Sequence, residues 1–181
     1  MNRQLNVGCG KVRLPGWMNV DIHGGDLRAD IRSLPFRDDG FDVALASHVL
    51  EHVLDSRTAM WEMRRVLRSG GVFIVRVPYG IDGLFDPFHH RAFDLTTMDR
   101  FCHDDPNSLE YEQLFDIDEV RVSNYRVPRF VWRMTVSRWR DGVQRWLRRI
   151  GFRIRASDGK LINPFPLTPR SEITWVLRCA K

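Results

Sequence analysis

Short apolar segments separated by turns dominate the first half of the chain. Residues 5–7 and 17–21 are brief apolar segments, and residues 26–31 form another strand-like piece. Residues 41–47 and 72–78 are near-continuous apolar runs, as in strands buried on both faces of a parallel sheet. The pattern predicts an α/β fold with a mostly parallel sheet.

One amphipathic helix is predicted between the two long apolar runs. Asp55 or Ser56 can cap its start, and Gly70 is expected to end it. The link between the first two segments, residues 11–16, is too short for a crossover helix, which needs about a dozen residues. The first helix is therefore expected to be shortened to a turn. Apolar residues recur at helical spacing in the predicted helix at Ala59, Met63, Val66 and Leu67.

Two further strands are predicted in the second half of the chain. Residues 112–125 have strand character, but their apolar residues change from odd to even positions at Asp118–Glu119. Such a change of phase predicts a bulge or a bend. Residues 172–179 form the final predicted strand, and a short helix is expected over residues 96–101.

The sequence also contains two insertions, at residues 79–95 and 127–170. Within the second, tryptophan and aliphatic residues recur at alternating spacings of four and three, with arginines among them. This pattern predicts a basic amphipathic helix over residues 129–151. Its apolar stripe can pack on the sheet as a lid, form an oligomer interface or contact an anionic membrane.

Composition places the chain among soluble globular proteins. Its 181 residues are 43% hydrophobic and 28% charged, which suits one domain over residues 1–181. No apolar run reaches the length of a membrane span and no secretory segment is recognised, so a cytoplasmic location is expected, with peripheral membrane contact as a further option. The net charge of +5 favours acidic partners. The three scattered cysteines give neither a zinc spacing nor a disulfide framework.

Candidate chemistry begins at the first strand. Gly8 and Gly10 follow it directly, and glycines there let a ligand approach the backbone closely, as in nucleotide sites. Asp21 ends the second apolar segment, where a carboxylate can accept hydrogen bonds from both hydroxyls of a ribose. The alternative for Asp21 is a solvated turn residue.

A second group of candidate residues lies in the first insertion. Residues 84–93 contain two histidines, an arginine and three phenylalanines. His89, His90 and Arg91 are the candidate catalytic residues, and His89 is the first choice for proton removal. A structural histidine bonded to Asp86 or to the backbone is the alternative for His89. No carboxylate and histidine set has a recognised ligand spacing, so no metal site is predicted.

In four features the chain resembles the class I S-adenosylmethionine-dependent methyltransferases of the methyltransferase type 11 kind. These are residues 5–10, Asp21, residues 30–36, and residues 41–71 with the sequence His48-Val-Leu-Glu51-His52. Within that family, the Gly-Trp-Met-Asn-Val-Asp sequence of residues 16–21 is similar to a subgroup of small enzymes often linked to cell-surface sugar pathways. The resemblance implies a Rossmann-like, mostly parallel seven-stranded sheet with an antiparallel last strand.

The resemblance also implies S-adenosylmethionine as the cofactor, with S-adenosylhomocysteine as the product. Asp21 would hold the ribose, Asp30 would accept from the adenine amino group, and Ile31 would supply a backbone donor and an apolar wall. Ser47 and His48 would lie beside the sulfonium, and the glycines would lie under the methionine part. The cofactor-binding candidates are Val7, Gly8, Cys9, Gly10, Asp21, Ile22, Asp30, Ile31, Ser47 and His48.

The expected function is methyl transfer to an oxygen atom of a small-molecule, sugar or lipid-linked acceptor. A nucleic-acid methyltransferase is the enzymatic alternative. The basic charge favours it, whereas the absence of an amino-methylation motif at Ser47-His48-Val49 opposes it. A non-catalytic module on the same fold, binding a membrane or a partner, is the third hypothesis.

Overall fold

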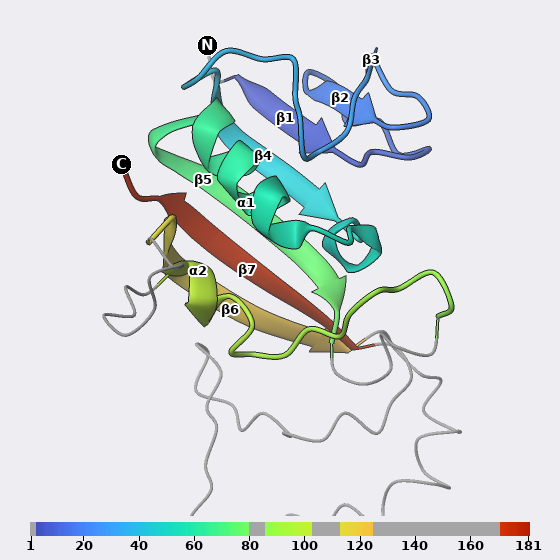
Figure 1. The fold of residues 1–181 in the computed structure, drawn as a ribbon, viewed down its shortest axis with the longest axis vertical. Coiled ribbons are helices and arrows are strands. Elements are labelled where there is room, and N and C mark those ends of the chain that lie inside the picture. Colours follow the sequence, from blue (N-terminus) through green and yellow to red (C-terminus); the bar gives the residue numbers. More distant parts are fainter. Residues whose placement is uncertain (1–2, 80–85, 103–112, 125–170) are drawn as a thin grey trace, which may run out of the picture.

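A computed structural model describes residues 3–79, 86–102, 113–124 and 171–181. These residues form a seven-stranded sheet in the order β3-β2-β1-β4-β5-β7-β6 (Figure 1). The strands are β1 (Gln4–Val7), β2 (Met18–Asp21), β3 (Leu27–Arg28), β4 (Phe41–Ser47), β5 (Leu67–Pro78), β6 (Phe115–Asn124) and β7 (Ser171–Cys179).

The direction of the strands decides where the functional residues meet. Strands β1 to β5 pair in parallel, whereas β7 is antiparallel to both β5 and β6. This confirms the predicted mostly parallel sheet with an antiparallel last strand. In Figure 1 the arrowheads of β1, β4 and β5 point the same way, so the segments after the parallel strands gather at one edge of the sheet.

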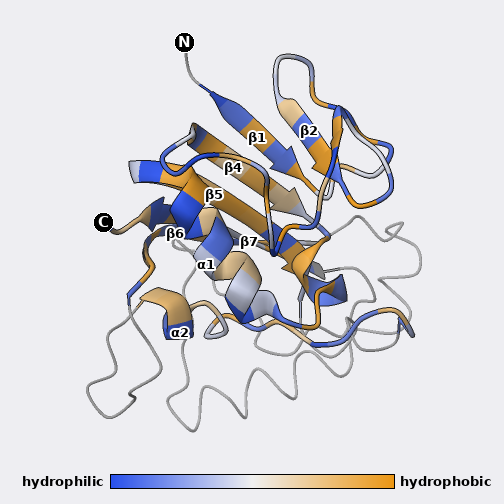
Figure 2. Ribbon diagram, turned by 45° about the horizontal axis from the view of Figure 1, so that its top comes forward, coloured by the Kyte–Doolittle hydropathy of each residue, from blue (hydrophilic) through white to orange (hydrophobic). Residues whose placement is uncertain are grey.

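Helix α1 (Ser56–Val66) packs against the apolar central strands (Figures 1 and 2). Its N-cap is Asp55, as predicted, because Oδ1 of Asp55 accepts a hydrogen bond from the N–H of Thr58 at 3.0 Å. The short 3₁₀ helix η1 (Leu50–His52) precedes α1, and the single-turn helix α2 (Asp99–Cys102) lies beside β6. The side chains of α1 that are fully buried are Ala59, Met60, Met63 and Val66.

Helix α1 ends earlier than the sequence predicted. Its last residue is Val66, and Leu67 is already extended, with φ −81° and ψ 139°. Leu67 is fully buried and pairs with Phe41 of β4, so the chain has to leave the helix to place this side chain in the sheet. The predicted end at Gly70 is wrong, and Gly70 lies within β5.

The predicted irregularity in the penultimate strand is confirmed. The pairing of β6 with β7 shifts between Ile117 and Glu119. Asp118 falls at the shift and forms an ion pair with Arg178 of β7. The extra residue therefore explains why apolar positions change phase along β6.

Turns connect β1 to β2, and this link contains no helix, in line with the shortened first helix that was predicted. Two buried side-chain amides hold it instead. Nδ2 of Asn6 donates to Oδ1 of Asn19 at 2.9 Å and to the carbonyl of Val12 at 3.1 Å. Asn19 in turn accepts from the N–H of Leu14 at 2.8 Å and donates to the carbonyl of Trp17 at 3.0 Å.

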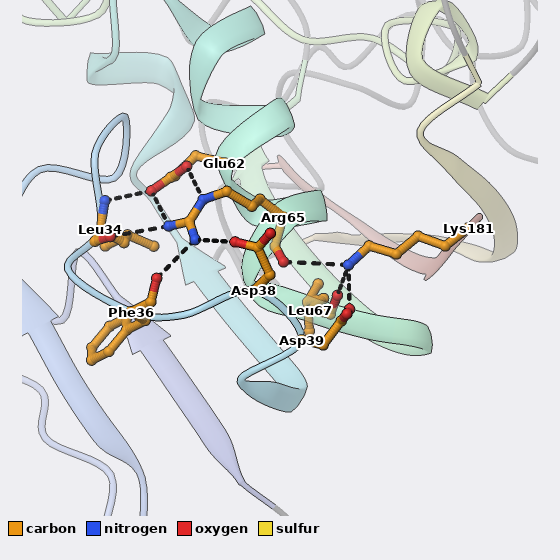
Figure 3. Close-up of polar contacts among 8 residues, drawn as sticks. All are labelled: Leu34, Phe36, Asp38, Asp39, Glu62, Arg65, Leu67 and Lys181. Carbon is orange, nitrogen blue, oxygen red and sulfur yellow. Dashed lines mark hydrogen bonds and ion pairs between the residues drawn. The ribbon is translucent and has the colours of Figure 1, made fainter.

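An arginine on α1 fastens the segment that leads into β4 (Figure 3). The guanidinium of Arg65 donates to the carbonyls of Leu34 at 3.1 Å and Phe36 at 2.8 Å, and to the carboxylates of Asp38 and Glu62, each at 2.7 Å. Glu62 also accepts from the N–H of Leu34 at 2.6 Å. Arg65 is the main reason why the pKa of Glu62 is lowered from its usual value.

The whole of the second predicted insertion and a part of the first fall outside the described residues. The second is residues 127–170, which include the predicted amphipathic helix, and the part of the first is residues 80–85. The rest of the first insertion is a loop in which Phe93 forms a bridge to Tyr79. Among the described residues, none of the helices combines the length and the apolar character required to cross a membrane.

Replacing Asn19 by alanine should destabilise the protein by about 3 kcal/mol, because several backbone groups of the β1–β2 link lose their partner. Urea unfolding followed by circular dichroism measures this change. The neighbouring Met18→Ala variant is the control and should cost less than about 1 kcal/mol, since Met18 is 38% exposed. An Asn19→Ala loss no larger than that of the control would contradict the proposed role of the amide pair.

Replacing Glu62 by glutamine should flatten the acid side of the stability profile. The native pKa of Glu62 lies below the usual 4.5, so the unfolded chain binds its proton more readily. The carboxylate therefore stabilises the fold above about pH 4.5, and this contribution disappears as the pH falls through the lowered native pKa. Glu62→Gln should cost about 1–2 kcal/mol at pH 7, and much less at pH 3. A difference from the wild type that does not change with pH would refute this assignment.

Candidate functional site

A cavity of about 410 Å³ opens at the carboxyl ends of β1, β2 and β4. This volume lies in the range of small-molecule sites, and such sites in open α/β sheets occur at this edge. The walls are formed by Gly8, residues 21–23, residues 29–32, His48, Val49, residues 52–54 and His90.

The end of β2 presents the Asp21 carboxylate in a fixed orientation. Its Oδ2 accepts from the N–H of Gly10 at 2.9 Å, and its Oδ1 accepts from the N–H of His23 at 2.8 Å. Each carboxylate oxygen has about two acceptor positions, so each retains one for a ligand. The turn after β1 and the turn after β2 thus each donate a hydrogen bond to the same carboxylate at the cavity wall.

Gly8 is required by packing inside the protein. Its φ is +63°, and a Cβ atom there would stand 2.3 Å from a methyl carbon of Val49. Val49 belongs to the turn after β4, so Gly8 lets the β1 and β4 ends pack closely. Gly10 differs, because no atom lies within 4 Å of the position of a Cβ, and a ligand can therefore approach its backbone.

Asp30 lies in the cavity wall and has a close partner. Its carboxylate accepts from the guanidinium of Arg32, with Nη2 at 2.6 Å from Oδ2 and Nε at 3.0 Å from Oδ1. These bonds are the main reason why the pKa of Asp30 is lowered. A ligand that approaches Asp30 therefore meets a carboxylate and a guanidinium together.

His48 adopts an uncommon backbone conformation directly after β4. Its φ is +56°, in the left-handed region, and its N–H donates to the carbonyl of Arg76 at 2.9 Å. Its ring lies between two carboxylates, with Nδ1 at 3.2 Å from Glu51 and Nε2 at 3.0 Å from Glu172. The contact with Glu51, followed by that with Glu172, raises the pKa of His48 against the opposing effect of burial.

The histidine-rich loop folds onto η1. The N–H of His90 donates to the carbonyl of Glu51 at 2.8 Å, and Nδ1 of His52 lies 3.1 Å from the carbonyl of Phe88. Arg91 secures the loop from the other side, because its guanidinium donates to the carbonyl of Leu54 at 2.5 Å and to a serine hydroxyl of α1. The loop is therefore attached at three points next to the cavity.

The three catalytic candidates have different positions in this loop. His90 is exposed and lines the cavity. The His89 side chain is only 11% exposed, and its ring packs edge to face on His52 with the centroids 4.7 Å apart. Arg91 contacts the start of α1 and is absent from the cavity wall. The geometry gives Arg91 a role in holding the loop.

The predicted cofactor residues divide into two groups. Six of them line the cavity, namely Gly8, Asp21, Ile22, Asp30, Ile31 and His48. Val7, Cys9, Gly10 and Ser47 do not line it, although Gly10 contributes through its bond to Asp21. Val49 and His52 belong to the His48–His52 sequence that carries the family resemblance. The sequence did not indicate that His23, Arg32, Val53 and Leu54 belong to the wall. Their only sequence signal is position, directly after a predicted strand or after a candidate residue.

Comparison with known proteins gives matches over part of the chain. Residues 5–75 match the family model of the methyltransferase domain. A protein of Mycolicibacterium smegmatis, named a probable S-adenosylmethionine-dependent methyltransferase, is 40% identical over 85 residues, which is 44% of this chain and 32% of the relative. The ubiquinone/menaquinone biosynthesis C-methyltransferase UbiE of Vibrio campbellii is 40% identical over 74 residues, 41% of this chain and 27% of the relative. The chain thus spans about a third or less of the length of these relatives.

The fold has a wider likeness. The crystal structure of the YcgJ protein of Bacillus subtilis matches 99% of this chain and 92% of its own, with a TM-score of 0.57 and 17% sequence identity. At that identity the likeness shows the fold alone. The chain has the Rossmann-like fold of the class I methyltransferases. The match over residues 5–75 supports a relationship of this chain to the class I methyltransferase family.

Proposed function

We propose that this protein is an S-adenosylmethionine-dependent methyltransferase whose cofactor occupies the cavity beside Asp21. The observation that carries the proposal is the Asp21 carboxylate itself. Two backbone N–H groups hold it at the cavity wall, and both oxygens keep an acceptor position for the neighbouring hydroxyls of a ribose. The methyltransferase-domain match over residues 5–75, which contains Asp21, supports the same assignment.

The remaining walls suit an adenosyl group. Ala29, Ile31 and Val49 supply apolar surface for a planar base, while Asp30 and its partner Arg32 place polar groups in the same wall. The open space above Gly10 leaves room for a ligand to pass close to the backbone. The chemistry of the residues in this cavity therefore fits the proposed cofactor.

S-adenosylmethionine supplies a methyl group that is activated by its positively charged sulfur. The protein has to orient this cofactor, hold the acceptor in line, and take up a proton if the acceptor is a hydroxyl. We assign proton removal to His90, because it is the histidine of the loop that lines the cavity. Arg91 acts as a positioning residue through its bonds to the start of α1.

For the acceptor we propose an oxygen atom of a small molecule, a sugar or a lipid-linked compound. Histidines beside the cavity favour a hydroxyl, which must lose a proton during transfer. Transfer to carbon is the second candidate, since UbiE is a C-methyltransferase by name. The resemblance of residues 16–21, Gly-Trp-Met-Asn-Val-Asp, to a subgroup of enzymes linked to cell-surface sugar pathways is the reason for including a sugar among the acceptors.

The basic insertion contributes a separate proposal, which rests on sequence alone. We propose that residues 129–151 either cover the acceptor side of the sheet or contact an anionic membrane, because tryptophans and arginines alternate along the predicted helix. A lipid-linked acceptor would suit the second arrangement. Binding to vesicles of anionic lipid that weakens with added salt would distinguish it from a lid.

Asp21→Ala should weaken S-adenosylmethionine binding by about 30- to 150-fold, because charge-assisted hydrogen bonds to the ribose are lost. Isothermal titration calorimetry measures the affinity. Asp118→Ala is a suitable control, since Asp118 is an exposed carboxylate on β6, and it should bind as the wild type does. Binding by Asp21→Ala within threefold of the wild type would show that the ribose site has been misplaced.

His90→Ala should lower kcat by about 10²- to 10⁴-fold on a hydroxyl acceptor and leave the cofactor affinity nearly unchanged. The measurement needs an acceptor, found by screening sugars and lipid-linked compounds for transfer of a labelled methyl group. The melting temperature of the variant should equal that of the wild type, because His90 is exposed. A fall in kcat of less than fivefold would leave His90 without a role in proton removal.

A further inference from the structure

We infer that Glu51, His52 and His89 form a binding site for a divalent transition-metal ion at the border of the cavity. One potential ligand atom from each residue lies within 4.8 Å of the other two. Glu51 and His52 come from η1, whereas His89 comes from the loop that folds onto η1.

Glu51 provides the strongest indication of a missing cation. It is fully buried, and neither of its carboxylate oxygens has a hydrogen-bond partner among the residues that the structure describes. Nδ1 of His48 lies 3.2 Å from Oε1 of Glu51, in an ion-pair contact without hydrogen-bond geometry. Burying an ionised carboxylate without hydrogen bonds costs several kcal/mol.

His48 is shared between two buried carboxylates. Its Nδ1 contacts Glu51 and its Nε2 contacts Glu172. A metal ion bound to Glu51 would occupy the oxygen lone pairs that His48 leaves without a hydrogen bond.

The ring of His52 is held in the form that a metal ion requires. A carbonyl oxygen only accepts hydrogen bonds, so Nδ1 of His52 must donate its proton to the carbonyl of Phe88. In the neutral ring this leaves the lone pair on Nε2. A backbone carbonyl behind the ring is the usual arrangement for histidines that bind metals through the other nitrogen.

His89 completes the set through the fold of the loop. Its N–H donates to the carbonyl of Asp86 at 3.0 Å, which forms a turn, and its ring packs against the His52 ring. Oδ2 of Asp86 lies 3.8 Å from Nε2 of His89. The bond from His90 to the carbonyl of Glu51 ties this turn to η1.

Two imidazoles and one carboxylate suit zinc or another borderline divalent ion, and they suit magnesium poorly, because magnesium prefers oxygen ligands. Ligand atoms around a tetrahedral zinc ion stand about 3.3 Å apart, so the side chains must move together by roughly 1 Å. His52 is exposed, which leaves room for its ring to shift while Nδ1 keeps its bond to the carbonyl of Phe88. Three protein ligands leave a coordination position open for a further ligand.

The open position lies next to the cavity, since His52 and His90 both line it. If the proposed methyltransferase function holds, an oxygen of the acceptor would occupy this position, and the ion would make its hydroxyl more acidic. This last step rests on the proposed function, whereas the metal site rests on the three side chains. An oxygen acceptor that binds a metal, such as a diol or a hydroxy acid, is then the substrate class to test first.

Zinc titration of the purified protein, without cofactor or acceptor, tests the site independently of methyl transfer. Calorimetry should show one Zn²⁺ bound with a Kd at or below about 10 µM, and excess Mg²⁺ should not compete. Removal of metal by a chelator should lower the melting temperature, and added zinc should restore it. His52→Ala and His89→Ala should each weaken zinc binding by at least about 100-fold, because each removes a direct ligand. His90→Ala is the matched control and should bind zinc as the wild type does.

Glu51→Gln keeps the shape of the side chain and removes its charge. It shows whether the buried carboxylate serves to bind a metal ion or only to pair with His48. If Glu51 binds a metal, this variant should lose zinc binding and the stabilisation that zinc provides. A wild-type protein that binds no zinc at about 100 µM would overturn the metal site. The metal site would also be overturned if His90→Ala lost zinc as completely as His89→Ala, or if Glu51→Gln bound zinc normally. A wild-type protein that binds zinc but does not bind S-adenosylmethionine would instead refute the proposed function and leave the metal site standing.

Discussion

The hydrogen bond between the buried amides of Asn6 and Asn19, together with their bonds to the backbone, holds the site together. In many α/β folds a helix connects the first two parallel strands, and its N-terminus shapes the ligand site. Here turns replace that helix, and the two amides satisfy backbone groups of the link that would otherwise lose their partners. With the link fixed in this way, the N–H of Gly10 reaches the carboxylate of Asp21.

The second constraint lies at the end of β4. His48 is in the left-handed region, Val49 packs on Gly8, and Glu51 is buried beneath the turn. A β-carbon at residue 8 would force Val49 away, so the glycine permits a close contact between two strand ends. The same turn places the His48 ring against Glu51 and Glu172, where a strained backbone and buried charges occur together. Such a combination is typical of functional sites.

The histidine loop and η1 depend on each other. The loop makes two hydrogen bonds to η1, one to the backbone carbonyl of Glu51 and one from the ring of His52. His90 then faces the cavity while His89 turns towards His52. In our proposals these two neighbouring histidines have different tasks, since His90 removes a proton at the cavity and His89 binds a metal ion behind it.

The sequence by itself determined the order of the strands along the chain, a helix cap at Asp55 or Ser56, an irregularity near Asp118 and the carboxylate at the end of β2. These features depend on local periodicity and turn chemistry, which residues within a few positions of one another specify. The early end of α1 could not be predicted, because Leu67 leaves the helix to pair with Phe41, 26 positions earlier in the chain. The hydrogen-bond partners of Asp30 and Arg91 could not be predicted either, because side-chain packing in the folded protein decides them.

Only the tertiary structure decided which histidines stand near which carboxylates. No sequence spacing relates His89 to His52, or Glu172 to His48, since the chain between them is long and its path depends on the sheet. The antiparallel strand β7 brings Glu172 to the end of β4, and the loop after β5 returns to η1. Contacts between distant residues are fixed by strand pairing and burial, and for that reason the metal ligands proposed here were absent from the sequence prediction.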